Sequence, residues 1–189
     1  MPVNPTVPPQ REEAREVKIF VYDYNAETLH EYQFDNIADV FPFRDNQNTT
    51  WINIDGLRKQ DVESISNHFD IHPLIIEDIL SMNQRPKMDE VVGILFCLLN
   101  MLYYDERKRS IEQEQVSIVL GKDFVITFQE DPRKDVFNPI RERMKVTSTK
   151  LRQGGADYLC YSMLDVIVDN YFTVMEKNLN NLQIALECK

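Results

Sequence analysis

Two pairs of acids are the residues whose types and spacing point most clearly to chemistry. In the first pair, Glu77 and Asp78 stand among Ile and Leu residues in the segment IHPLIIEDIL at 71–80. Adjacent side chains of a helix point about 100° apart, so this pair cannot form one compact site by itself. A cation bound by either acid needs further ligands from another element or another chain. The spacing equally allows both acids to project from the helix edge into solvent.

The second pair, Asp165 and Asp169, lies four residues apart within LDVIVDNYF. This spacing puts both carboxylates on one face of a helix, where like charges cost roughly 0.2–0.5 kcal/mol. A bound cation or a neighbouring Arg or Lys would relieve that repulsion. Hard ions such as Mg²⁺ take carboxylate oxygens and keep several waters, so their sites leave little signature in a sequence. A metal site and a structural ion pair both remain open for these two residues.

Other chemistry has weak support, and the sequence predicts a protein that is not an enzyme. The chain has no GxSxG motif and no glycine-rich phosphate loop among its five glycines. His68 and His72 have the spacing of a helical zinc pair, but Pro73 and the residues before it predict a helix break between them. The three cysteines form no CxxC, and their apolar or helical surroundings are typical of reduced cytosolic thiols.

The composition limits the class of partner. The chain has 189 residues, of which 43% are hydrophobic, so a sizeable core is expected. A formal net charge of −10 argues against nucleic acids and anionic membrane surfaces, whose phosphates need basic patches, and is compatible with a cation. The N-terminus lacks the pattern of a signal peptide. The longest apolar run, 91–104, contains Gly93 and Asn100 and is shorter than a membrane span.

The elements that would position these acids can be read from hydrophobic periodicity. We predict strands at 17–24 and 29–34, paired as a hairpin, and at 51–54, 91–104, 115–120 and 123–129. Gly121 and Lys122 predict a tight hairpin between the last two strands. We predict helices at 36–41, at 57–69, from Pro73 to about 82–83, at 139–151 and from 156 onward. The continuous apolar run at 91–104 predicts a central strand covered on both faces. The fold class is therefore α/β, with a mixed β-sheet sandwiched between helices (α/β/α).

The last predicted helix is long and amphipathic. Its apolar residues recur every three to four positions, as in a coiled coil, and it reaches Lys189 without a stop signal. We therefore expect the natural protein to continue beyond this chain. The predicted organisation is a flexible lead-in at 1–15, an α/β/α domain at 16–155, and a helix at 156–189 that leads to a further stalk and transmembrane region.

Seven motifs together resemble the cytoplasmic domain of CorA-type magnesium and cobalt transporters, in order and over roughly 16–189. They are WINIDG (51–56), IHPLIIEDIL (71–80), QRPK (84–87), EQVSIVL (114–120), FQED (128–131), VFNPIRER (136–143) and ADYLCYSMLDVIVDNYF (156–172). The resemblance implies an α/β/α domain followed by a stalk helix and two transmembrane helices, in a homopentamer of the cell's inner membrane with this part on the cytoplasmic side. The family's Gly-Met-Asn pore signature is absent. The expectation is thus a regulatory part that cannot conduct ions.

The resemblance also implies a site. Mg²⁺ or Co²⁺ would be both the regulatory and the transported ion, without an organic cofactor, and Mg²⁺ bound between neighbouring cytoplasmic domains would hold the channel closed. The acid at the position of Asp78 would face an acid on the neighbour's stalk, which would lie beyond Lys189. Glu77 and Asp165 would belong to a second, nearby site, and Asp169 joins them on spacing alone. A related zinc transporter and a free-standing α/β binding module are the alternatives.

Overall fold

The structure is a computed structural model that describes residues 13–187. Its strands are β1 (Lys18–Tyr24), β2 (Leu29–Phe34), β3 (Thr49–Asp55), β4 (Lys87–Val91), β5 (Ile94–Asp105), β6 (Ser110–Leu120) and β7 (Phe124–Gln129). Its α-helices are α1 (Lys59–His68), α2 (Pro73–Leu80), α3 (Asn138–Met144), α4 (Lys150–Gln153) and α5 (Ala156–Glu187). Two 3₁₀ helices, η1 (Ile37–Phe43) and η2 (Pro132–Lys134), complete the elements.

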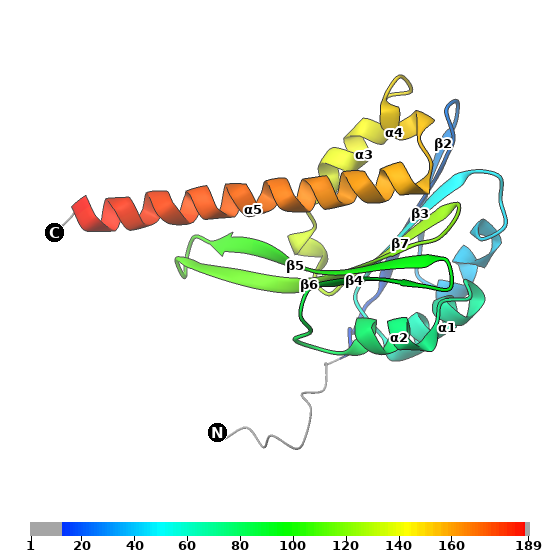
Figure 1. Cartoon of the computed structure of the whole chain (residues 1–189), viewed down its shortest axis with the longest axis horizontal. Coiled ribbons are helices and arrows are strands. Elements are labelled where there is room, and N and C mark those ends of the chain that lie inside the picture. The colour runs from blue at the N-terminus through cyan, green and yellow to red at the C-terminus, as the bar shows by residue number, and fades with distance from the viewer. Residues whose placement is uncertain (1–12, 188–189) are drawn as a thin grey trace, which may run out of the picture.

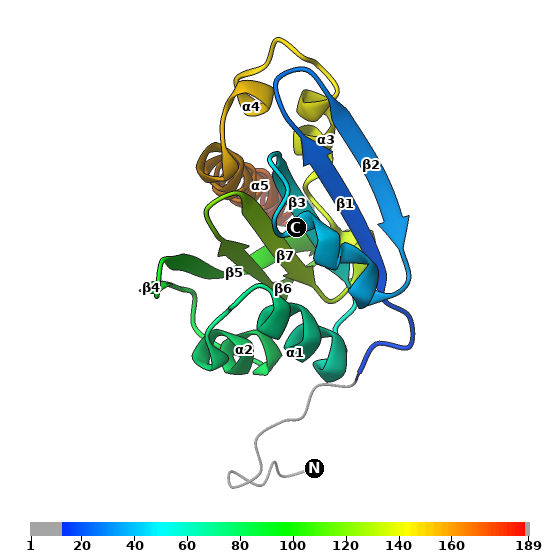
Figure 2. The ribbon, with the colours of Figure 1, turned by 90° about the vertical axis from the view of Figure 1, so that its right-hand side faces the viewer.

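One seven-stranded sheet with the order β2-β1-β3-β7-β6-β5-β4 forms the middle layer. Only β3 and β7 pair in parallel, and the other neighbours are antiparallel. Helices α1 and α2 cover one face, and α3, α4 and the long helix α5 cover the other (Figures 1 and 2). The predicted mixed sheet between helical layers is confirmed.

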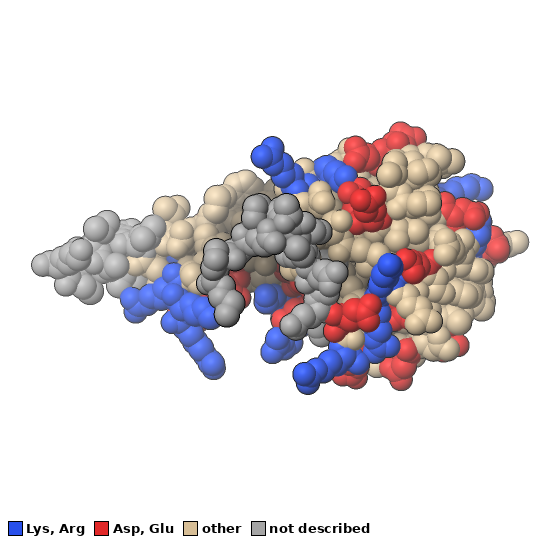
Figure 3. Space-filling view, turned by 90° about the horizontal axis from the view of Figure 1, so that it is seen from below, with Lys and Arg blue, Asp and Glu red and all other residues tan. Residues whose placement is uncertain are grey.

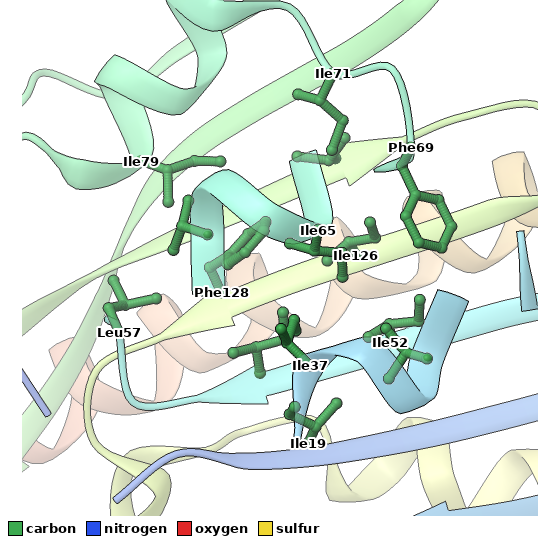
Figure 4. Packing of buried hydrophobic residues seen from close by; sticks show 14 of the residues in the cluster. Ile19, Ile37, Ile52, Leu57, Ile65, Phe69, Ile71, Ile79, Ile126 and Phe128 are labelled. Carbon is green, nitrogen blue, oxygen red and sulfur yellow. The ribbon is translucent and has the colours of Figure 1, made fainter. Parts of the chain in front are cut away.

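The two faces of the sheet hold separate cores. On the first face, Ile52 of β3 and Ile126 and Phe128 of β7 pack with Ile65 of α1 and Ile79 of α2 (Figure 4). On the second face, the residues between these, such as Trp51 and Val125, pack with α5. Because strand side chains alternate between faces, a strand that is apolar on both faces lies between two helical layers. The sheet therefore separates the side chains of α2 from those of α5.

The strand predicted at 91–104 is confirmed as β5, which pairs with a strand on each side and contributes to both cores, but it begins at Ile94 rather than at 91. The chain turns at Val92 and Gly93, whose φ angles are +52° and +76°. This two-residue turn joins β4 to β5, and β5 is next to the edge of the sheet. A continuous apolar run carries no period that marks a turn, and Val is a residue that rarely adopts positive φ. Both features concealed the hairpin.

The helix predicted at 139–151 was wrong, because α3 and α4 are separate. Thr149 is the N-cap of α4, and its hydroxyl accepts from the N–H of Arg152 at 3.4 Å. The same hydroxyl donates to the carbonyl of Val146 at 2.9 Å. Thr and Ser side chains that bond to nearby backbone compete with helix formation, which explains the break. The remaining predicted elements are confirmed, although β6 begins at Ser110 rather than at 115 and 36–41 is a 3₁₀ helix; β4 was not predicted.

The predicted domain limits stay predictions. Residues 1–12 of the lead-in lie outside the described residues, and so do the last two residues of the chain. The predicted long helix is confirmed as α5, and its N-terminal half is part of the second helical layer.

Candidate metal centre

The two histidines around the α1–α2 junction have structural roles. His68 ends α1, and its ring stacks on Phe41 with ring centroids 4.1 Å apart. His72 is the N-cap of α2, where its Nδ1 accepts the N–H of Leu74 at 3.2 Å. Pro73 then occupies the first turn, where a missing N–H costs nothing. The predicted helix break between the histidines is confirmed. The His68 ring takes part in packing, and the His72 ring caps a helix.

Helix α2 presents its first acidic pair on two different sides. Ile75 and Ile79 are each 1% exposed and point into the core. Because four residues make about one turn, Glu77 is carried to the exposed side of α2, and Asp78 is half-buried on its flank. The two carboxylates thus diverge, as the spacing predicted, and the structure does not bring them into one site.

Asp78 is paired with a lysine that the sequence analysis did not single out. Its Oδ2 lies 2.6 Å from Nζ of Lys87, which is the last residue of the QRPK motif. The hydrogen bond to Asp78 raises the pKa of Lys87. The end of α2 is also held by Gln115, whose Nε2 donates to the carbonyls of Asp78 and Ser81 at 3.4 Å and 3.1 Å. A divalent cation at Asp78 would therefore compete with an ammonium group.

Glu77 opens into a shallow groove between α1 and α2. The groove mixes acidic, basic and apolar side chains, and its lining residues are Lys59, Glu63, Asn67, Pro73, Ile76, Glu77, Leu80 and Ser81. Figure 3 views the molecule from the side of α1 and α2 and shows carboxylates interspersed with basic side chains. This face therefore carries charges of both signs.

The second acidic pair lies on the outer side of α5. Asp165 and Asp169 are both exposed, whereas Val166 and Ile167 between them are buried against the sheet. Helix α5 is fixed to β5 by Asn170, whose Nδ2 donates to the carbonyl of Leu102 at 2.8 Å. Asp165 and Asp169 share a face, as their spacing predicted, and neither forms an ion pair with another described residue.

The two pairs are not neighbours within one chain. Helices α2 and α5 lie on opposite faces of the sheet (Figure 1), so the structure does not bring Glu77 and Asp165 together. Across residues 13–187, no three His, Cys, Asp or Glu side chains come close enough to hold a metal ion. Within one chain the two acidic pairs therefore lie apart, and a cation that used both pairs would need two chains.

A third group of charges, missed by the sequence analysis, lies where β3 ends. Asp55 is 4% exposed, and burial together with the nearby charge of Asp135 raises the pKa of its carboxyl to about 6. Arg141 of α3 pairs with Asp135, donates to the hydroxyl of Tyr22 at 2.9 Å, and lies 5.1 Å from the ring centroid of Trp51. This cluster ties α3 to β1 and β3. Asp55 lies in the motif WINIDG and Arg141 in the motif VFNPIRER, so both residues stood in motifs that the sequence analysis had quoted.

Fold and acids together define a class of protein: an α/β/α domain with acidic side chains on both of its outer helical layers. The family model described as CorA-like Mg²⁺ transporter protein matches residues 46–186. The chain belongs to this family.

Two curated relatives agree with this assignment. The cobalt/magnesium transport protein CorA of Thermotoga maritima is 42% identical over 161 residues, which are 85% of this chain and 46% of that protein. The putative metal ion transporter YfjQ of Bacillus subtilis is 31% identical over 127 residues, 67% of this chain and 38% of that protein. The chain thus spans less than half the length of these two relatives. None of the helices within residues 13–187 combines the length and the apolar character of a membrane span.

Solved structures share the fold. The soluble domain of CorA from Methanocaldococcus jannaschii aligns with a TM-score of 0.60 at 16% identity, over 90% of this chain and 64% of that one. The cytoplasmic domain of ZntB from Vibrio parahaemolyticus aligns with a TM-score of 0.57 at 12% identity, over 89% and 64%. At these identities the likeness concerns the fold alone.

Proposed function

We propose that this chain is the cytoplasmic, cation-sensing domain of a longer CorA-like Mg²⁺/Co²⁺ transporter, in which Mg²⁺ bound between subunits of a homopentamer favours the closed channel. The observation that carries the proposal is that the acids of α2 and α5 lie on opposite faces of one sheet. Two subunits packed side by side can bring the α2 face of one against the α5 face of the next. A site of this kind exists only when the subunits are in register.

The available ligands suit magnesium. Asp78, Glu77, Asp165 and Asp169 offer carboxylate oxygens only, and Mg²⁺ is bound through one or two carboxylates with several retained waters. Lys87 tunes the Asp78 site, because an ion there must displace its ammonium group or share the carboxylate with it. Such competition weakens binding, which is appropriate for a sensor of an abundant ion. Relatives named as cobalt and magnesium transporters support Mg²⁺ or Co²⁺ as the ion.

Weak sites are sufficient when symmetry repeats them. A ligand present at its Kd stabilises the state that it binds by about 0.4 kcal/mol per site. Five equivalent sites confined to the closed state would contribute roughly 2 kcal/mol, a bias of about 30-fold. The ion must prefer the closed state, because equal affinity for both states shifts nothing.

Limited proteolysis of the full-length transporter tests the assignment. We expect millimolar Mg²⁺ or Co²⁺ to protect the wild-type protein and Asp78→Ala or Asp165→Ala to weaken this protection several-fold. Asp89→Ala is the matched control, since Asp89 also approaches Lys87, at 3.7 Å, but lies on β4. Full protection in both Asp78→Ala and Asp165→Ala would sink the site assignment. A Zn²⁺ titration run in parallel would identify a zinc transporter if Zn²⁺ alone protected.

The reading frame downstream of Lys189 tests the proposal at the level of the protein. Two apolar spans, the first ending in Gly-Met-Asn, are expected. A stop codon near Lys189 without such spans would instead favour a free-standing binding module.

A further inference from the structure

The carboxyl ends of β3 and β7 meet at one end of the sheet, where the chain leaves these parallel neighbours in opposite directions. Strand β3 leads to α1 on the first face, whereas β7 leads through η2 to α3 on the second face. In open α/β sheets, small ligands bind outside the carboxyl ends of strands, where the connections of neighbouring strands diverge in this way. The topology therefore favours a ligand site at this end of the sheet.

A pocket of about 350 Å³ lies at this end, on the second face of the sheet. Its lining comes from β1, from the last residue of β3, and from α3 with the segment before it. Phe20 and Tyr22 of β1 supply aromatic surface, and Asp55 of β3 supplies a carboxyl group. The volume is at the lower end of the range for pockets that bind small organic molecules. The pocket thus suits a small organic ligand.

Three of the charged side chains that line the pocket already have partners. The guanidinium of Arg141 pairs with Asp135, and its other nitrogens donate to neutral side-chain oxygens. Nζ of Lys18 lies 3.7 Å from Oε1 of Glu16. Asp55 is the remaining charged group of the lining, and it forms no ion pair within residues 13–187. The charge that the pocket leaves available is therefore negative.

Asp55 is 4% exposed, and only one of its oxygens is hydrogen-bonded within residues 13–187. Oδ1 accepts from Nδ2 of Asn53 at 3.0 Å, whereas Oδ2 has no partner in that part of the chain. A buried carboxylate without an opposite charge is costly, and the raised pKa of Asp55 reflects that cost. Perturbed groups that line a pocket are candidates for ligand binding, because a ligand of opposite charge removes the cost.

We propose that this pocket binds a small aliphatic amine, whose ammonium group pairs with the carboxylate of Asp55 and whose alkyl chain lies against Phe20 and Tyr22. An amine is favoured over an anion because the cationic side chains of the lining are already paired. It is favoured over a hydrated metal ion because aromatic rings attract ammonium groups and pack against their alkyl chains. The site uses none of the acids of α2 and α5, so it goes beyond the proposed function.

Binding of an amine at Asp55 should depend on pH. Lys18 lies opposite Asp55 in the register of β1 and β3, and the other charged groups that act on this carboxyl are Asp135, Arg141 and Glu114. With a pKa of about 6, the carboxyl is roughly one-tenth ionised at pH 5 and nine-tenths ionised at pH 7. An alkylammonium group stays charged at both values, as lysine does. The affinity should therefore rise about tenfold between them.

An NMR titration of the 189-residue chain with n-butylamine tests the proposal. Butan-1-ol and butyrate serve as neutral and anionic probes with the same alkyl chain. We expect n-butylamine to bind about tenfold more tightly at pH 7 than at pH 5, with the largest shifts at the amides of Phe20, Tyr22 and Asp55. The two other probes should bind at least about tenfold more weakly at pH 7. Adding Mg²⁺ at constant ionic strength should not displace the amine.

Three variants locate the interaction. Asp55→Asn should lower the affinity for n-butylamine at least about tenfold and remove its pH dependence, and this variant should fold because it no longer buries a charge. Lys18→Gln should raise the affinity several-fold, because it removes a competing ammonium group. Asp123→Asn is the matched control and should bind like wild type, since Asp123 lies before β7, at the opposite end of that strand, with its side chain 57% exposed.

Several results would overturn the proposal. Unchanged affinity in Asp55→Asn, or no binding of n-butylamine to the wild-type chain, would refute the ammonium contact. Tighter binding of butyrate would identify an anion site, and displacement of the amine by Mg²⁺ would identify a metal site. Each of these results leaves the proposed function intact, because that function depends on the acids of α2 and α5 and is tested by proteolysis of the full-length transporter.

Discussion

At the scale of single residues, the most unusual group is the buried carboxyl of Asp55. It accepts a hydrogen bond from Nδ2 of Asn53 at 3.0 Å, and the amide of Asn53 is in turn linked to Thr127 and Gln129 across the parallel β3–β7 pair. Burial affects the pKa of Asp55 more than this hydrogen bond does, and the pKa rises from 3.8 to about 6. A carboxyl whose pKa is raised in the folded state binds its proton more tightly there than in the unfolded chain. Its stabilising contribution is complete below about pH 4 and is lost as the pH rises through 6.

Asp55→Asn should therefore change the dependence of stability on pH. Relative to wild type, the variant should gain roughly 2–3 kcal/mol in free energy of unfolding between pH 4 and pH 7, because it no longer buries a charge. Urea unfolding at several pH values measures the difference. Asp45→Asn, whose side chain is 91% exposed, controls for the loss of an acid. A constant difference between wild type and Asp55→Asn across this range would contradict the account.

Val92 has a backbone conformation that Asn and Gly adopt more readily than Val does. It is 87% exposed, and its φ of +52° lies in the left-handed region, where β-branched side chains are strained. Asn at this position of a two-residue hairpin turn is preferred. We expect Val92→Asn to raise the free energy of unfolding by about 1 kcal/mol. Val146→Asn, an exposed valine outside any hairpin, should show no such gain, and equal effects at both positions would disprove the explanation.

At the scale of elements, α5 has one buried side and one exposed side that contain comparable residues. Met163 is fully buried against the sheet, whereas Met175, on the other side of α5, is 47% exposed. Met163→Ala should cost about 2–5 kcal/mol of stability in the 189-residue chain, and Met175→Ala less than about 0.5. Thermal or urea unfolding of the two variants provides the comparison. A similar loss in both would mean that Met175 is packed against another part of the 189-residue chain and would contradict the assigned burial.

The helices and strands themselves were largely predictable, and the errors have physical causes. The period of apolar residues located β1, β2, α1, α2 and α5, because one-sided burial imposes a period on the sequence. The run at 91–104 lacked a period, so its hairpin at Val92 remained hidden. The helix predicted at 139–151 was too long, because the side-chain bonds by which Thr149 begins α4 as a separate helix depend on three-dimensional geometry.

At the scale of the whole molecule, the sheet determines what one chain can bind. It keeps the acids of α2 away from those of α5, so a single copy offers no complete ligand set among its described residues. We expect the isolated 189-residue chain to be a monomer at micromolar concentration and to gain less than about 1 kcal/mol from 10 mM Mg²⁺. Light scattering and thermal unfolding with and without Mg²⁺ test this. A stable pentamer of the short chain, or strong stabilisation of its monomer, would contradict it.

Part of the geometry of the candidate site could be predicted from the sequence. The divergence of Glu77 and Asp78 and the shared face of Asp165 and Asp169 follow from helix geometry, so the sequence alone determined both. The sequence also predicts a hard cation as the ligand, because it offers pairs of carboxylates and places a helix break between its two closely spaced histidines, and this stays a prediction. Lys87 beside Asp78, the sheet between the two acidic pairs, and the cluster of Asp55 with Arg141 were decided only by the tertiary structure. The physical reason is range: helix periodicity is a local property, whereas these contacts join residues that only the pairing order of the sheet brings together or keeps apart.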